Sequence, residues 1–445
     1  MRKNIKHYLY YILLAVIVVF GILLILSMPK QEEFFLVSES EILFVVPILL
    51  LLLILGIIIL TVIVRKKQKI SGLEINDIAS EEINSGESRF YMLTQVDKEK
   101  AEAKPEQFEN DISMSELCER FRNFSASKLG LYYSIRDIRR FIASLTVSHI
   151  IIMQGMSGTG KTSLAYAFGE FLSNHSVIVP IQPMWKERTD LVGYYNEFTK
   201  KFNETTLLHK MYEANYSDRI YVTVLDEMNI ARVEYYFAEF LSLLELPKAE
   251  RRYIDVVSDK WENDPKLLKE GQLKLPENMW FIGTANNDDS TFAISDKVYD
   301  RAMIMNLDKK TQVFYAEETK GANVSYKRFS ELIKQAKKEY GITGRRLRQV
   351  KELDKYLIEK FHITFGNRIM KQLKEYVSSY IACGGTEEEA IDDIIAKKIM
   401  RKLEMQNPVY VRNEIDGLCE RIESIFGEDK LEVTKEYLRH LERTI

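Results

Sequence analysis

The feature that most restricts the fold of this chain is a glycine-rich segment at residues 155–162, with the sequence GMSGTGKT. An apolar run of strand length (149–154) precedes it, and a stretch with the periodicity of an amphipathic helix (163–172) follows it. Strand, glycine-rich turn and helix in this order are the context that the pattern GxxxxGK[ST] requires. The segment therefore predicts a β–loop–α unit with the turn directly after a buried strand.

This loop contains the residue types that bind a chain of phosphates. Glycines let backbone N–H groups curl around phosphate oxygens, and the start of the next helix adds a positive dipole. Lys161 is expected to bridge the β- and γ-phosphates, and the Thr162 hydroxyl to ligate Mg²⁺. The residues expected to contact the nucleotide are Gly155, Ser157, Gly158, Thr159, Gly160, Lys161, Thr162 and Ser163.

Two further apolar runs end in polar residues that suit hydrolysis. The run at 220–225 leads into Asp226-Glu227, and the run at 279–284 leads to Asn286. Ligands of open α/β sheets bind at the carboxyl ends of the strands. We expect Asp226 to join the Mg²⁺ ligands, Glu227 to polarise the attacking water, and the Asn286 amide to orient that water.

The order of the elements predicts the fold class. Further strands are expected at 177–182 and 302–307, after a helical lead-in over about 115–148. Short strands that alternate with helices predict an α/β fold with a doubly wound, five-stranded parallel sheet over residues 113–310. Residues 311–445 have a helical pattern and are expected to form a C-terminal helical lid domain.

Two apolar runs without charges, residues 8–28 and 42–64, predict a transmembrane helical hairpin within residues 1–69. At ~1.5 Å per residue they reach about 31 and 34 Å, enough to cross a hydrocarbon core of ~30 Å. Basic residues flank the outer ends and glutamates fill the connector, so both termini are expected in the cytoplasm. We therefore expect a multi-pass protein of the cell inner (cytoplasmic) membrane. A cleaved signal peptide followed by a single anchor is the alternative.

Residues 70–112 are acidic and polar, and predict a flexible linker after the hairpin. One apolar patch at 90–93, with the sequence FYML, interrupts this linker and is expected to form a short strand that docks on the main body.

The composition narrows the set of partners and metals. The chain has 62 basic and 65 acidic residues, a net charge of -3, so direct nucleic-acid binding is not favoured. Its three cysteines lie far apart, and its six histidines are scattered without metal-ligand spacing. A disulfide framework and a thiolate zinc site are therefore excluded.

Stretches beyond the glycine-rich loop resemble one group of AAA+ NTPases, the McrB-like branch near the MoxR and dynein-related ATPases. They are 181–196 (IQPMWKERTDLVGYYN), 225–237 (LDEMNIARVEYYF) and 283–301 (GTANNDDSTFAISDKVYDR). Residues 225–237 are similar to an extended Walker B segment, and residues 283–301 to a sensor 1 and arginine-finger segment. The resemblance covers about residues 131–307 and becomes weaker over the C-terminal helices.

The resemblance implies a ring of identical subunits, commonly a hexamer, with nucleotide at the subunit interfaces. Arg301 would be the arginine finger, which reaches the γ-phosphate in the neighbouring subunit. An intrasubunit or surface ion pair is the alternative for this side chain. Asn229 and Arg232 would lie near the same interface, or cap and decorate a helix. Arg368 would be the sensor 2 residue that contacts the nucleotide, with Arg345 as the weaker alternative.

These observations favour a membrane-anchored AAA+ ATPase that couples Mg-nucleotide hydrolysis to remodelling of a protein partner at the cytoplasmic membrane face. ATP is the expected nucleotide. GTP stays open because residues 285–290 match the GTP signature of McrB-type proteins only in part. One alternative is a GTP-driven motor of a McrB-like restriction or defence complex with a separate nuclease. Another is a nucleotide-gated membrane scaffold with little turnover. Tyr194 and Tyr195 are candidates for gripping a substrate in the ring, or ordinary packing residues.

Overall fold

A computed structural model describes residues 88–286, 291–308 and 311–444 of the chain. The two apolar runs predicted to span a membrane, 8–28 and 42–64, lie outside these residues. Within the described ranges, no helix combines the length and the apolar character needed to cross a bilayer.

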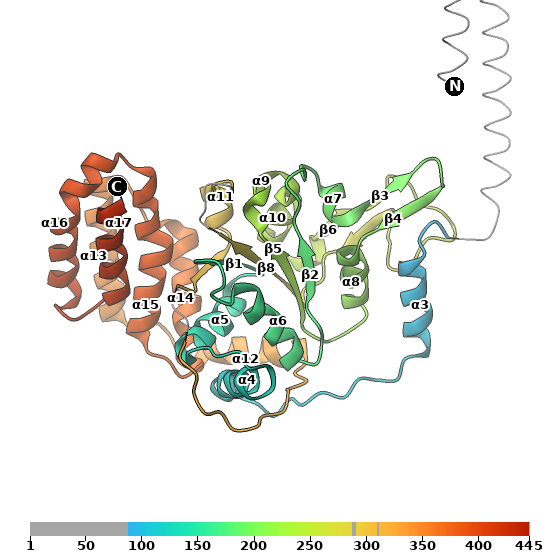
Figure 1. Cartoon of the computed structure of the whole chain (residues 1–445), viewed down its shortest axis with the longest axis horizontal. Helices are drawn as coiled ribbons and strands as arrows, with labels where there is room; N and C mark the ends of the chain where they lie inside the picture. The colour runs from blue at the N-terminus through green and yellow to red at the C-terminus, as the bar shows by residue number, and fades with distance from the viewer. Residues whose placement is uncertain (1–87, 287–290, 309–310, 445) are drawn as a thin grey trace, which may run out of the picture. The chain divides into compact units, whose positions relative to one another are not determined.

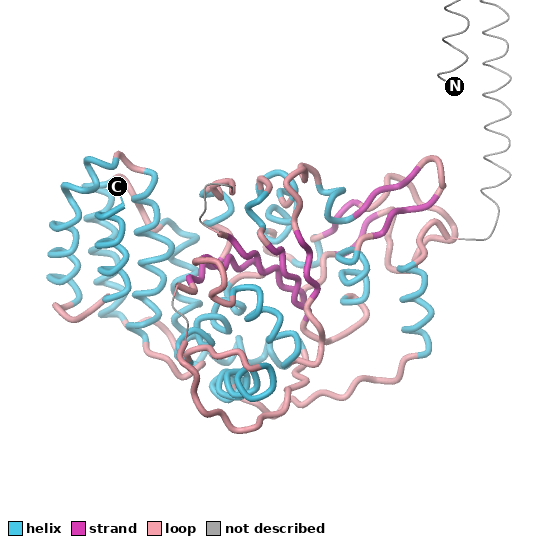
Figure 2. The backbone as a smooth tube through the Cα atoms, viewed as in Figure 1, coloured by secondary structure: helices cyan, strands magenta, loops and turns pink. Residues whose placement is uncertain are grey.

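The central sheet consists of five parallel strands in the order β2-β5-β8-β1-β9, as predicted for a doubly wound fold (Figures 1 and 2). The strands are β1 (Ile150–Gln154), β2 (Val177–Pro180), β5 (Tyr221–Asp226), β8 (Met279–Ala285) and β9 (Met303–Asn306). β1 pairs with β8 on one side and with β9 on the other. The glycine-rich loop therefore leaves the sheet beside the carboxyl ends of strands that arrive much later in the chain.

Alternate residues of these strands face two different hydrophobic cores. In β1, Ile150 and Ile152 belong to one core, and Ile151 and Met153 to the other. Both faces are covered by helices (Figure 1), which explains why the strands are almost continuously apolar. The first core contains α3 (Met92–Glu102), α7 (Arg188–Val192), α8 (Thr206–Ala214), α9 (Val233–Tyr236), α10 (Ala238–Glu245) and α11 (Asp296–Tyr299). The other core contains α4 (Met114–Leu129), α5 (Ile135–Val147), α6 (Lys161–Phe171) and α12 (Tyr326–Glu339).

Two antiparallel hairpins are inserted into this α/β framework. β3 (Gly193–Asn196) and β4 (Lys201–Glu204) form the first, between β2 and α8. β6 (Tyr253–Asp255) and β7 (Gln272–Lys274) form the second, between α10 and β8. Neither hairpin was expected from the sequence. Tyr194 on β3 is exposed, Tyr195 packs against the Trp261 ring, and Phe198 in the β3–β4 turn is 99% exposed.

The apolar patch at 90–93 contacts the main body, but it begins a helix and not the predicted strand. Phe90 and Leu93 are buried, and α3 starts at Met92. The Glu204 carboxylate at the end of β4 accepts three backbone N–H groups at this helix start, at 2.7–2.8 Å. These amides have no partner within the helix, so a remote carboxylate stabilises them. This part of the predicted flexible linker is therefore ordered.

Arg89 joins the same segment to the second hairpin. Its buried guanidinium pairs with Asp259 and Asp264 in the β6–β7 connection, at 2.9 and 2.8 Å. It also lies over the Trp261 ring, 4.3 Å from the centroid. The start of the described chain is thus bound to both hairpins.

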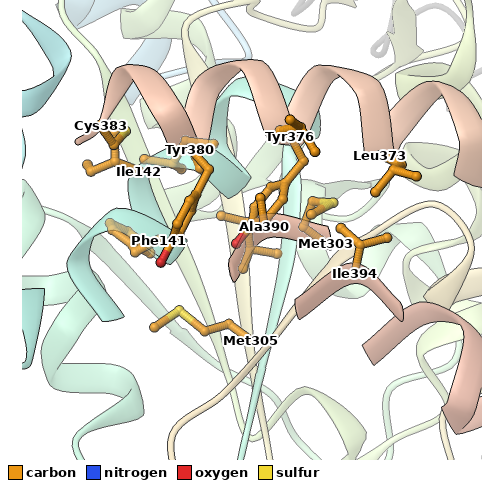
Figure 3. Close-up of a cluster of buried hydrophobic side chains, with 14 of the residues drawn as sticks. Phe141, Ile142, Met303, Met305, Leu373, Tyr376, Tyr380, Cys383, Ala390 and Ile394 are labelled. Carbon is orange, nitrogen blue, oxygen red and sulfur yellow. The ribbon is translucent and has the colours of Figure 1, made fainter. Parts of the chain in front are cut away.

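The C-terminal residues form helices, as expected for the lid. They are α13 (Gly344–Phe361), α14 (Gly366–Ala382), α15 (Glu387–Ile394), α16 (Pro408–Phe426) and α17 (Glu432–Thr444), with a π-helical turn η3 (Ile395–Ile399) and a 3₁₀ segment η4 (Met400–Met405) after α15. Figure 3 shows side chains of α14, Leu373, Tyr376 and Tyr380, in one cluster with Phe141 of α5 and Met303 of β9; Phe141 lies beside Tyr380. The lid and the sheet therefore share a continuous hydrophobic core.

Candidate nucleotide-binding site

The glycine-rich loop has a backbone conformation that other residues rarely adopt. Gly155, Gly158 and Gly160 have φ values of 139°, 76° and 92°. A Cβ atom on Gly155 would also lie 2.4 Å from the carbonyl oxygen of Leu307. Glycine is therefore required there both for the backbone angle and for the close approach of the chain after β9.

Lys161 is the first residue of α6, directly after the loop. Its Nζ donates to the carbonyl oxygens of Gly155 and Met156, both at 2.8 Å. Burial lowers the pKa of this ammonium, and the nearby carboxylates of Asp308 and Asp226 oppose that shift. The loop thus places a partly desolvated positive charge at the predicted phosphate position. Asp308, just after β9, was not a sequence candidate.

The two predicted Mg²⁺ ligands lie in direct contact. Asp226 Oδ1 accepts hydrogen bonds from the hydroxyls of Thr162 at 2.7 Å and Thr284 at 2.9 Å. Thr284 Oγ1 in turn accepts the backbone N–H of Glu227 at 2.9 Å. Neighbouring strands β5 and β8 bring these groups to one edge of the sheet. Hydroxyl and carboxylate oxygens are the hard donors that Mg²⁺ takes in nucleotide sites, so this pair fits the ion.

Glu227 has a left-handed backbone, with φ of 52°. Such a conformation costs about 1–3 kcal/mol for a residue with a side chain, and is frequent at functional sites. Its side chain lines an open cleft together with the loop and Asn286. The residues of this cleft are Ser157, Gly158, Gly160, Lys161, Thr162, Ser163, Asp226, Glu227, Thr284 and Asn286.

Of the predicted nucleotide contacts, Gly155 and Thr159 do not line the cleft but support the loop. The Gly155 carbonyl accepts from Lys161, and the Thr159 hydroxyl donates to the Met156 carbonyl at 2.9 Å.

Arg301 and Arg368 also lie outside the residues that line this cleft. Arg301 lies just before the amino end of β9, whereas the phosphate loop follows the carboxyl end of β1. The Arg301 carbonyl accepts a hydrogen bond from the Ser148 hydroxyl. Both guanidinium groups pair with Glu245 at the end of α10, at 2.7 Å for Arg301 and 2.5 Å for Arg368. Within the subunit, Arg301 therefore forms an ion pair with Glu245, which is the alternative to the arginine-finger role named in the sequence analysis. Arg368 is placed beside Arg301 and not beside its own subunit's phosphate loop. The weaker candidate, Arg345, is exposed.

Several further residues support the site in ways that the sequence did not predict. Asn229 Nδ2 donates to the carbonyl of Asn286 at 2.9 Å, and Thr284 links the two acidic residues. The Tyr133 hydroxyl donates to the Gly160 carbonyl at 3.1 Å. A hydroxyl at the carboxyl end of β8 was a visible signal for Thr284. Tyr133 and Glu245 belong to no motif that would have identified them.

Arg232 contacts neither the loop nor the acidic pair in any described interaction. Its guanidinium lies over the Phe292 ring, 5.0 Å from the centroid, and over the Tyr235 ring at 5.9 Å. Its place at a subunit interface stays a prediction.

A phosphate loop between a strand and a helix, with a hydroxyl and two acidic residues at adjacent strand ends, defines a P-loop NTPase. Residues 150–302 match the AAA domain of the dynein-related subfamily, and residues 318–444 match a domain of unknown function. The nucleotide-hydrolysing part of the chain is therefore an AAA+ ATPase domain.

Other comparisons add little. No curated protein gives a significant match to the sequence. A crystal structure of a candidate ATPase from Cytophaga hutchinsonii is similar at 13% identity and a TM-score of 0.44, and covers 78% of this chain and 98% of that one.

Proposed function

We propose that this protein is a membrane-anchored AAA+ ATPase of the McrB-like branch that remodels a protein partner at the cytoplasmic membrane face. The observation that carries the ATPase part is the contact of Thr162 with Asp226, next to Glu227, at the mouth of the phosphate loop. This arrangement supports hydrolysis because it places a metal-ligand pair and a general base on one edge of the sheet.

In this proposal, the loop amides and Lys161 bind the phosphates, and Thr162 and Asp226 hold Mg²⁺. When bound, the ion would neutralise the phosphate charge. Glu227 accepts a proton from the water that attacks the γ-phosphate, and Asn286 orients that water. The Thr284 hydroxyl fixes the positions of Glu227 and Asp226 relative to each other, since it is hydrogen-bonded to both residues.

The assembly part of the proposal is a homohexameric ring. Arg301 does not line the nucleotide cleft of its own subunit and lies at the amino ends of the strands, away from the phosphate loop. This position supports a role toward the nucleotide of a neighbouring subunit. A cation that arrives from outside can accelerate phosphoryl transfer by ~10³–10⁵. The lipid bilayer is proposed as the site of anchoring, on the basis of the apolar runs at 8–28 and 42–64.

The test is steady-state hydrolysis by the purified full chain with Mg²⁺ and ATP. Glu227→Gln should abolish turnover and preserve nucleotide binding, because it removes the base and keeps the shape of the cleft. Glu420→Gln, at an exposed position on α16, is the control and should keep full activity. Equal turnover in Glu227→Gln would refute the assigned role.

The same assay separates the alternatives. A strong preference for GTP in competition would favour the restriction-type motor. Background turnover by the unmodified, assembled chain would favour the scaffold.

A further inference from the structure

A buried lysine of the lid contacts the backbone on both sides of Arg301. Lys398 is 3% exposed, and its Nζ donates to the carbonyl oxygens of Tyr299 at 2.6 Å, Ala302 at 2.5 Å and, at a longer 3.4 Å, Asp300. The carbonyl of Arg301 itself accepts from the Ser148 hydroxyl at 2.9 Å. Four successive carbonyl groups, 299–302, are therefore bound by side chains.

The position of Lys398 in the lid is unusual. It lies in the π-helical turn η3, which interrupts the regular geometry after α15. Turns of this kind are rare overall and occur often at functional sites. Burial lowers the pKa of Lys398 to about 7, so an ammonium is unfavourable here unless its hydrogen bonds compensate.

The nearby acidic residues are paired with other lid cations. Arg401 pairs with Asp296 of α11, and Lys402 lies 3.9 Å from Asp300. The donors of Lys398 are therefore directed to the backbone of the finger turn, residues 299–302, and not to a carboxylate.

A second lid cation extends the contact toward the phosphate loop. The Arg401 guanidinium lies 3.8 Å from the centroid of the Tyr299 ring. The Tyr299 hydroxyl accepts from Gln154 Nε2 at 2.6 Å, and Gln154 is the last residue of β1 before the loop. The finger turn is thus fixed by the lid on one side and by β1 on the other.

We propose that the C-terminal domain positions the arginine finger, with Lys398 as the positioning residue that fixes the finger turn. In this proposal, the domain at 318–444, which matches a family of unknown function, determines how Arg301 is oriented toward the nucleotide of the neighbouring subunit. This inference rests on the proposed finger role of Arg301. Lys398 touches no nucleotide and acts through the backbone of residues 299–302.

The test is Lys398→Met in the full chain, which keeps the length of the side chain and removes its donors. We expect kcat to fall roughly 10- to 100-fold, because an error of about 1 Å in a catalytic group can cost ~10²-fold. The Kd of a fluorescent ATP analogue should stay unchanged, because none of the lid residues that the structure describes lines the cleft of the same subunit.

Lys435→Met is the matched control. Lys435 is also a lid lysine that is 3% exposed, but it pairs with Glu423 of α16 and Glu432 of α17. The control should lower stability and leave kcat within about twofold. Lys398→Gln, which keeps an amide donor, should be intermediate, and it serves as the second variant if Lys398→Met does not fold.

The double variant Lys398→Met/Arg301→Ala separates positioning from a general loss of structure. If Lys398 acts through Arg301, the double variant should be no slower than Arg301→Ala alone. Multiplicative slowing, or a kcat of Lys398→Met equal to that of Lys435→Met, would overturn the inference and leave the ATPase proposal intact. Full activity of Arg301→Ala would instead overturn the finger role itself.

Hydrogen exchange gives a readout that does not depend on activity. The amides of residues 297–303 should exchange faster in Lys398→Met than in Lys435→Met. Equal exchange in the two variants would show that the lid lysine does not hold the turn.

Discussion

Thr284→Val removes one hydroxyl that connects the two acidic residues of the cleft. Thr284 is 3% exposed, and its Oγ1 donates to Asp226 and accepts from the Glu227 backbone, both at 2.9 Å. Valine has nearly the same shape, so the substitution leaves no cavity. Its effect therefore reports the two hydrogen bonds.

The size of the effect follows from these bonds. A hydrogen bond to a charged group contributes about 1.5–3 kcal/mol, and an unpaired backbone N–H adds ~1 kcal/mol or more. Glu227 is exposed, so water can reach its backbone N–H and the second contribution should be near its lower limit. We expect a loss of about 2.5–4 kcal/mol in the free energy of unfolding. Turnover should fall about 10-fold or more, because the left-handed backbone of Glu227 loses the hydrogen bond from its N–H to Thr284, and its carboxylate is then less precisely positioned.

Thr223→Val is the matched control on the neighbouring strand. Thr223 is fully buried on β5, and its Oγ1 has no hydrogen-bond partner among the residues that the structure describes. Removing an unpaired hydroxyl should be neutral or stabilising. Urea unfolding of both full-length variants, followed by the fluorescence of the buried tryptophan on β8, measures the difference. Equal stability of the two variants, or normal turnover in Thr284→Val, would refute the assigned hydrogen bonds.

Two further predictions concern the loop and the lid. Gly155→Ala should weaken the binding of a fluorescent ATP analogue more than ~10-fold, because its Cβ would lie 2.4 Å from the Leu307 carbonyl oxygen. A Cβ on Gly158 meets no atom of the described residues within 4 Å, so Gly158→Ala should be milder. Equal Kd values for the two variants would contradict the clash. For Lys398, burial lowers the pKa to about 7 from an ordinary value of ~10.4, so between these values the unfolded chain binds the extra proton. Stability should therefore rise with pH, by roughly 1 kcal/mol from pH 7 to pH 8. The charged groups that act on Lys398 are Asp300, which opposes the shift, and Arg401, Lys402 and Arg368, which reinforce it. Lys398→Met should lose this part of the slope in urea midpoints measured across that range, and an unchanged slope would contradict the assignment.

The sequence was most informative where the signal is local. The loop at 155–162 and the strand ends at Asp226 and Asn286 are contiguous patterns of residue type and periodicity, and the structure brings them to one cleft. The parallel sheet followed from the same patterns, because a strand, a turn and a helix in series restrict the topology strongly.

Contacts between distant residues could not be predicted in this way. Glu204 caps a helix that begins more than a hundred residues earlier, so the sequence around α3 by itself predicts only a flexible linker. Glu245 belongs to no motif, yet it pairs with both Arg301 and Arg368. The π-helical turn that directs Lys398 inward depends on a local change in helix geometry, and a periodicity of ~3.6 residues cannot reveal it.

The contacts of Arg89 with the two hairpins determine which part of the fold would first resist a pulling force on the chain before residue 88. The Arg89 carbonyl accepts from the backbone N–H of Phe202, and its guanidinium pairs with Asp259 and Asp264. Tension applied to the chain before residue 88 is therefore carried first by bonds to the two inserted hairpins. Among the described residues, Arg89 makes these bonds to the hairpins and not to the central sheet or the phosphate loop, so the force would reach the sheet and the loop only through the hairpins. A pull on this end would displace the hairpins before it disturbed the nucleotide cleft.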